Sequence, residues 1–225
     1  LAKIVAIATL TTVSYFVGLN QRASYKDFPK GVQEAVVTEH QDVESTIKNA
    51  SDLFKAGKPV EAYDTFERAK VRSNHLKKID PNHNDLENVI FQYGAAIVDT
   101  NDIVSRHIDP LYQNIVSGSP ERIAEYVVLG GNLSWLDGQL EIIGKDSGAY
   151  HRLKGDQNMQ RALLNYYVDN SLMWYDAQEQ MREKLKECPN KTEQINLAIK
   201  IFDERMGYIR ERKEEINKFK LEINK

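Results

Sequence analysis

The fold is decided by residues 156–225, which read DQNMQRALLNYYVDNSLMWYDAQEQMREKLKECPNKTEQINLAIKIFDERMGYIRERKEEINKFKLEINK. Apolar residues recur here at steps of three and four, a spacing that places them on one face of a helix. The first half carries the stripe Met159, Leu163, Tyr166, Met173, Ala177 and Leu185; the second carries Ile195, Ile199, Phe202, Met206, Ile209, Ile216 and Ile223. Pro189 separates them. The stretch therefore predicts two long helices packed as an antiparallel hairpin.

Helical spacing also runs through residues 32–146, which we interpret as a helical bundle. Its first stripe is Val32, Val36, His40, Val43, Ile47, Ala50 and Phe54, and its second includes Ala62, Phe66, Ala69 and Val71. Pro110 should kink or end the third helix of the bundle, which begins near Asn84. Residues 144–155 read as a loop. No strand pattern competes with the helical one, so the sequence predicts an all-α fold.

One segment of this bundle carries a local resemblance. Residues 49–81 match a helix–turn–helix unit at Ala50, Gly57, Ala62, Phe66 and Ala69. In these features the segment resembles a single tetratricopeptide repeat, and this likeness implies a protein-binding surface without catalysis. The match departs where the helix continues through Val71 to Ile79, and no second copy follows. An ordinary helical hairpin remains the alternative interpretation.

The N-terminal segment, residues 1–19, favours a membrane anchor. Residues 4–19 read IVAIATLTTVSYFVGL without a charge, a run of about sixteen residues where a membrane span needs roughly 20. An uncleaved secretory signal and a buried helix of a soluble protein are the competing interpretations. We predict a single-pass transmembrane helix that contacts the bilayer through residues 4–19, followed by a polar linker over residues 20–31.

Two arguments bear on the orientation of this anchor, and they disagree. Lys3 precedes the apolar run, whereas Arg22, Lys26 and Lys30 follow it, a distribution that by itself favours a cytoplasmic C-terminal part. The commoner signal-anchor arrangement favours the opposite orientation. We follow the second argument and expect most of the chain to lie outside the cytoplasm, in the periplasm or its organellar equivalent.

Composition excludes some classes of function. The chain of 225 residues has a formal net charge of −3 and a pI near 6.0, so no overall charge attracts it to nucleic acid. Its single cysteine, Cys188, excludes an intramolecular disulfide. We expect no nucleic-acid partner.

Sequence motifs for chemistry are missing from the chain. The five histidines form no zinc or di-iron motif, and no glycine-rich phosphate loop is present. His40 lies on an apolar stripe and is interpreted as a packed side chain. We therefore expect no catalytic residue, no metal site and no cofactor. An unrecognised helical enzyme remains an alternative, and the turn with His75, His83 and Asp85 is then the first candidate site.

Aromatic residues gather on the first helix of the C-terminal hairpin. Tyr166, Tyr167, Trp174 and Tyr175 form a band wider than one helical stripe. They either fill the core of the hairpin or form a face that docks a partner, because tyrosine and tryptophan are favoured anchors at interfaces. These four are the candidate partner-binding residues.

These features together predict a non-catalytic protein. We expect a structural, assembly or adaptor subunit of a membrane-associated complex, whose helix faces bind other protein subunits. The alternative is a soluble or secreted helical domain that binds a ligand and buries residues 4–19 as a core helix.

Overall fold

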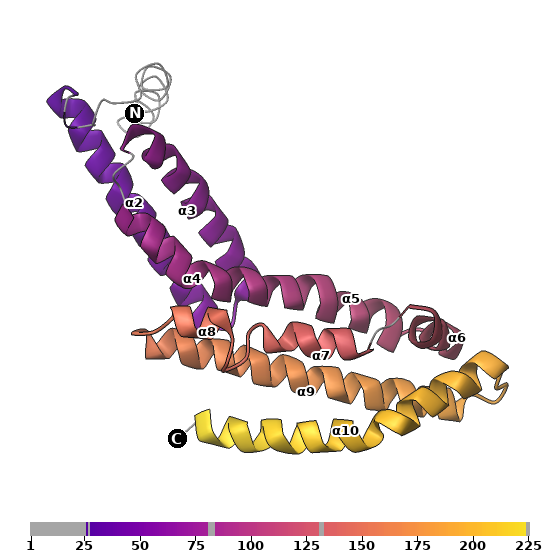
Figure 1. Ribbon diagram of the computed structural model, residues 1–225. Coiled ribbons are helices and arrows are strands. Elements are labelled where there is room, and N and C mark those ends of the chain that lie inside the picture. The colour runs from indigo at the N-terminus through magenta and orange to yellow at the C-terminus, as the bar shows by residue number, and fades with distance from the viewer. Residues whose placement is uncertain (1–25, 27, 81–83, 131–132, 224–225) are drawn as a thin grey trace. The chain divides into compact units, whose positions relative to one another are not determined.

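Helices account for all the regular structure that is described. The computed structural model describes residues 26, 28–80, 84–130 and 133–223, and each regular element in these ranges is a helix (Figure 1). The prediction of an all-α fold is confirmed for this part of the chain.

The chain divides into two compact units, Leu1–Ile97 (unit 1) and Val98–Lys225 (unit 2). The boundary falls inside a helix, and inside the range 32–146 that the sequence pattern presents as one bundle. An uninterrupted helix keeps its apolar spacing whichever unit its residues contact. The pattern therefore gives no sign of this division.

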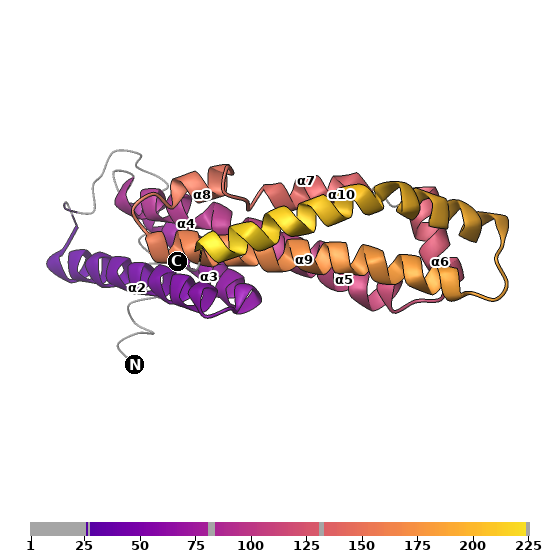
Figure 2. The same ribbon diagram turned by 90° about the horizontal axis from the view of Figure 1, so that it is seen from below.

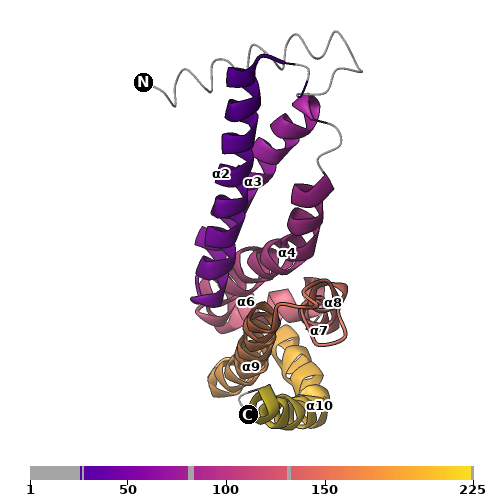
Figure 3. The ribbon, with the colours of Figure 1, turned by 90° about the vertical axis from the view of Figure 1, so that its left-hand side faces the viewer.

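Unit 1 is built on an antiparallel pair of helices. These are α2 (Lys30–Lys55) and α3 (Pro59–Ile79), which lie side by side in Figures 1 and 3. Gly57 makes the turn between them with φ at +83°, a conformation that costs an L-residue with a Cβ atom. Pro59 then opens α3, where its missing N–H leaves no intrahelical bond unmade.

A third helix, α4 (Asn84–Asp102), covers this pair within unit 1. Its buried Leu86, together with Val89, Ile90 and Tyr93, packs against the apolar cluster of α2 and α3. A Cβ atom on Gly94 would lie only 3.1 Å from Cζ of Phe66. The missing side chain of Gly94 therefore allows α4 to approach Phe66 closely.

The residues that carry the tetratricopeptide resemblance are placed as that resemblance implies. Ala50, Ala62, Phe66 and Ala69 are buried between the helices. The hairpin itself is longer than the predicted unit, because α2 begins at Lys30 and has 26 residues. The likeness therefore describes the turn and the crossing point of a larger hairpin.

Unit 2 is built on the two longest helices, α9 (Gln157–Glu187) and α10 (Glu193–Ile223), of 31 residues each. They run side by side in Figures 1 and 2. Ion pairs cross between them in opposite chain order: Arg182 with Asp203, Lys213 with Asp176, and Lys220 with Asp169. This order fixes an antiparallel register. Asp156 caps α9 by accepting the amide of Met159 at 3.0 Å.

Shorter elements make up the rest of unit 2, and several of them pack on this pair. They are η2 (Ile103–Ile108), α5 (Asp109–Leu111), η3 (Tyr112–Val116), α6 (Pro120–Glu125), η4 (Tyr126–Gly130), α7 (Leu133–Glu141) and α8 (Gly148–Arg152). Side chains also bond to backbone across the packing: Tyr112 donates to the carbonyl of Met173 and Lys184 to that of Val116, each at 2.6 Å. The second bond satisfies a carbonyl at a helix end.

The sequence predicts that Pro110 either kinks or ends its helix. In the structure the helix does not end there but continues past the proline. It changes to π-helical geometry on both sides, in η2 and η3. The amide of Asp109 donates to the carbonyl of Val104, five residues back. A wider turn accommodates the proline, which has no N–H and crowds the carbonyl four residues earlier.

Three details of the predicted pattern are wrong. Val71 is 52% exposed and Met173 is 41% exposed, so neither belongs to a buried stripe. On α3 the buried face continues instead through Ser73, Leu76 and Ile79. The expected loop over residues 144–155 contains α8, whose first turn is capped by Ser147. Small and polar residues on these faces concealed the true stripe.

The predicted anchor over residues 1–19 and most of the linker over 20–31 lie outside the described residues. In the described part of the chain, no helix combines the length and the apolar character that a membrane span requires.

The turn at Gly57 provides a test of the unit 1 hairpin. We expect Gly57→Ala to lower the free energy of unfolding by about 1 to 2 kcal/mol, because alanine resists a positive φ. Gly31→Ala is the matched control: Gly31 lies in the first turn of α2 with open space at its Cβ position. Denaturant unfolding of both variants checks this, and equal effects would contradict the role of the turn.

Candidate functional site

All four predicted partner-binding residues belong to unit 2, and three of them are buried there. Trp174 is 0% exposed, Tyr175 is 2% and Tyr167 is 7%, while Tyr166 is half-buried. This placement fits the interpretation in which the aromatic band fills the core. A direct contact of these side chains with a partner stays a prediction, and it would require α9 to open away from its neighbours.

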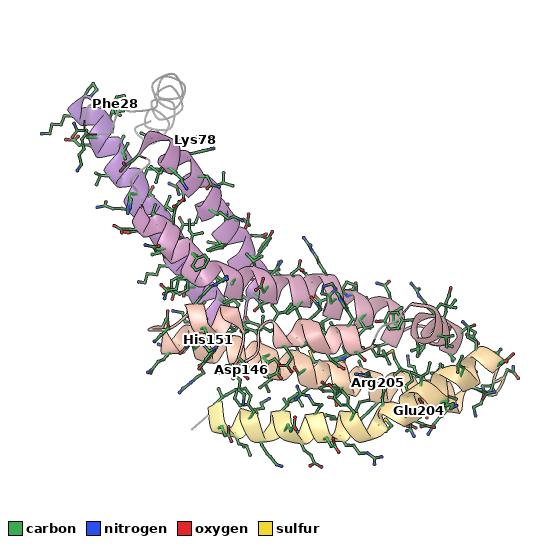
Figure 4. All side chains as sticks on the ribbon, viewed as in Figure 1. Phe28, Lys78, Asp146, His151, Glu204 and Arg205 are labelled. Carbon is green, nitrogen blue, oxygen red and sulfur yellow. The ribbon has the colours of Figure 1, made fainter. Side chains whose placement is uncertain are left out.

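A half-buried carboxylate organises the polar contacts around Trp174. Asp137 on α7 accepts the indole N–H of Trp174 at 2.7 Å and Nη2 of Arg205 at 2.8 Å. Arg205 also donates to Gln178 at 3.0 Å and to Ser134 at 3.1 Å. Figure 4 labels Arg205 and its neighbour Glu204 on α10. The network joins α7, α9 and α10 and satisfies both charges.

A second network lies farther along the same helices. Tyr167 donates its hydroxyl to Oε1 of Glu141 at 2.8 Å, and Arg212 donates to the same oxygen at 2.5 Å. Burial, reinforced by Glu141, raises the pKa of Tyr167 far above its ordinary value. Burial also raises the pKa of Tyr166 to about 12. The Tyr167 hydroxyl thus keeps its proton well above neutral pH and remains a hydrogen-bond donor to Glu141.

The histidine turn that would serve an enzyme is only partly described. His75 and Asp85 are both exposed, and His83 lies outside the described residues. Across residues 26, 28–80, 84–130 and 133–223, no group of three or more His, Cys, Asp or Glu side chains is arranged to hold a metal ion.

An apolar groove with an acidic rim opens on unit 1, and we call it the α2 groove. It has a volume of about 380 Å³ and lies between α2, the end of α3 and the start of α4. The lining residues are Val36, Val37, His40, Gln41, Glu44, Leu76, Asp80 and Asp85. Val36 and Leu76 form a buried floor, while Val37 is 46% exposed. A partner can therefore reach apolar surface here.

His40, interpreted from sequence as a packed side chain, lies at this groove. Its imidazole is 19% exposed, and its Nδ1 lies 3.6 Å from Oε1 of Glu44. The groove was not predicted from the sequence. The signal that could have indicated it is the pair of adjacent valines, Val36 and Val37, which widens the apolar stripe of α2 beyond one helix face. The second valine has no helix packed over it in the described structure.

A larger and more open depression lies between α2 and α3. It measures about 650 Å³ and is lined by Thr46, Asn49, Thr65, Glu67, Arg68, Val71 and Arg72. Arg72 is already bound there, with its guanidinium 2.6 and 2.8 Å from the carboxylate oxygens of Glu39. This ion pair holds α3 to α2. The guanidinium of Arg72 is therefore already used within the fold, and we take the α2 groove as the better candidate for binding a partner.

Comparison with known proteins finds no matching family model, no matching curated protein and no matching solved structure.

The Asp137–Arg205 pair provides a test of the structural role of these networks. The two side chains are 13% and 17% exposed, so removing either one leaves the other charge poorly solvated. We expect a double-mutant cycle of Asp137→Ala and Arg205→Ala to give a coupling energy of about 1 to 3 kcal/mol.

The control is an exposed pair, Lys200 and Glu204, which lies within α10 with side chains 72% and 68% exposed. Its coupling should be about 0.5 kcal/mol or less, because water screens exposed charges. Chemical denaturation measures both cycles. Equal couplings would show that burial does not strengthen the Asp137 network.

The buried tyrosines predict how stability depends on pH. The folded state holds the proton of Tyr166 up to a pKa of about 12, whereas the unfolded side chain loses it near 10. Stability is therefore fully present below pH 10 and falls as the pH rises through this interval. Tyr166→Phe should make that fall shallower, as measured by denaturant unfolding at a series of pH values. A profile that Tyr166→Phe leaves unchanged would argue against burial of this hydroxyl.

Proposed function

We propose that the chain is a non-catalytic subunit that binds other proteins of a membrane-associated complex. The observation that supports this is the α2 groove, where exposed apolar surface and carboxylates lie together on helix faces. The polar groups of unit 2 have a different use. Asp137, Arg205, Glu141 and Arg212 bond to neighbouring helices, and so they stabilise the fold.

Membrane association is the second part of the proposal and is supported by the sequence of residues 4–19. An anchor there would hold the helical units at the bilayer, with most of the chain outside the cytoplasm. Confinement to the membrane raises the effective concentration of the chain for partners in the same bilayer. Modest affinity at a helix face would then be sufficient for a stable complex.

Fractionation of native membranes tests the anchor. Two carboxylates placed in the apolar run by Val13→Asp and Val17→Asp should release the chain from the membrane, because each costs about 2.5 to 3.5 kcal/mol at the centre of a spanning helix. Val60→Asp is the control, since Val60 is an exposed residue of α3. Recovery of the unaltered chain in the soluble fraction without detergent would reject the anchor and favour the soluble ligand-binding alternative.

Co-purification tests the binding function. Extraction of the unaltered chain from native membranes in mild detergent should recover it with other protein subunits in a fixed ratio. Mass spectrometry and cross-linking identify those subunits. A chain that is recovered alone under these conditions, at every detergent concentration that keeps it folded, would contradict the proposed function.

A further inference from the structure

We propose that the α2 groove binds a basic amphipathic helix of a protein partner, an inference that rests on the proposed binding function. The occupant would place aliphatic side chains against Val36, Val37 and Leu76, and lysine or arginine side chains against the carboxylates at the rim. The shape of the groove, its exposed apolar surface and its charge each support this choice.

The shape of the groove fits a helix lying along α2. Its lining positions on α2 run from Val36 to Glu44, a rise of about 12 Å or roughly two helical turns. An amphipathic helix presents apolar side chains at steps of three and four, so two or three of them fall within this length. The volume of about 380 Å³ accommodates side chains of that size.

The apolar part of the groove is accessible to a partner. Val36 and Leu76 form its floor, with 5% and 2% of their surfaces exposed, and Val37 stands at the edge with 46% exposed. Covering Val37 removes apolar surface from water, which favours association. An aliphatic side chain between Val37 and Leu76 would extend the unit 1 core outward.

The charge of the groove selects a basic occupant. Glu44, Asp80 and Asp85 line it, and within the described residues its lining contains no lysine or arginine. Glu44 is 51% exposed and has His40 as its near neighbour, while Asp85 is exposed at the start of α4. Lys77 at the end of α3 forms an ion pair with Glu87 of α4. Negative potential at an apolar surface attracts a cationic helix and repels anionic lipid headgroups.

Peptide binding to the complete chain in phosphatidylcholine nanodiscs tests this proposal. The probe is a fluorescent peptide of about 18 residues that forms an amphipathic helix with leucine on one face and lysine on its flanks. A second peptide has glutamate in place of lysine. Fluorescence anisotropy should show saturable binding of the basic peptide only, and this binding should weaken as salt rises from about 50 to about 300 mM.

Matched variants locate the binding. Glu44→Lys should weaken the basic peptide by about tenfold, because it reverses a charge at the rim. Asp64→Lys makes the same change on exposed α3 surface outside the groove and should leave affinity within about twofold. Val37→Asn should weaken binding, whereas Val60→Asn, at a valine of similar exposure, should not.

Three results would overturn the proposal. The first is a lack of selective binding, seen either as equal binding of the acidic and basic peptides or as no saturable binding of the basic peptide up to about 100 μM. The second is an equal loss from Asp64→Lys and Glu44→Lys. The third is binding to anionic-lipid nanodiscs that Glu44→Lys strengthens and the basic peptide does not compete, since this surface would then face lipid.

Co-purification of the Glu44→Lys chain separates this proposal from the proposed function. If the variant loses the subunits that the unaltered chain retains, the groove is their binding site. If both chains retain the same subunits, the groove proposal fails and the binding function stands. If the unaltered chain recovers no subunit, the binding function itself fails.

Discussion

The carboxylate of Asp137 accepts one hydrogen bond from Trp174 on α9 and another from Arg205 on α10. Through this single side chain α7 is joined to both long helices of unit 2. The bonds also allow a tryptophan to be fully buried with its N–H satisfied, which an apolar core alone would not permit. Because Asp137 and Arg205 bond to each other and to neighbouring helices, we assign both side chains to holding the fold together.

Charged residues of the described structure occur in two arrangements. In the first, charged side chains bond across helices, as Glu141 does with Tyr167 and Arg212 in unit 2 and as Arg72 does with Glu39 in unit 1. In the second, the carboxylates Glu44 and Asp85 of unit 1 stand at the edge of an apolar groove. Residues in the first arrangement hold helices together, and residues in the second remain open to an incoming chain. The proposed binding function follows from that difference.

The spacing of apolar residues along the sequence predicted those features of the fold that depend on a single helix or turn. The stripe from Val36 to Phe54, the turn at Gly57 and the two helices on either side of Pro189 are present. Contacts between helices were not predictable in the same way. Asp137 and Arg205 are 68 residues apart and carry no local signal. Trp174 illustrates the limit: an interface anchor and a core residue have the same identity and spacing, and only packing distinguishes them.

Site-specific photocrosslinking in native membranes tests the central claim most directly, namely that partners bind unit 1 at the α2 groove. A photoreactive benzoylphenylalanine replaces Val37 at the groove or Met173 on the exposed surface of α9; the native side chains are 46% and 41% exposed. The account predicts a protein adduct from position 37 and none from position 173. An adduct from position 173 alone, or no adduct from either position, would contradict it.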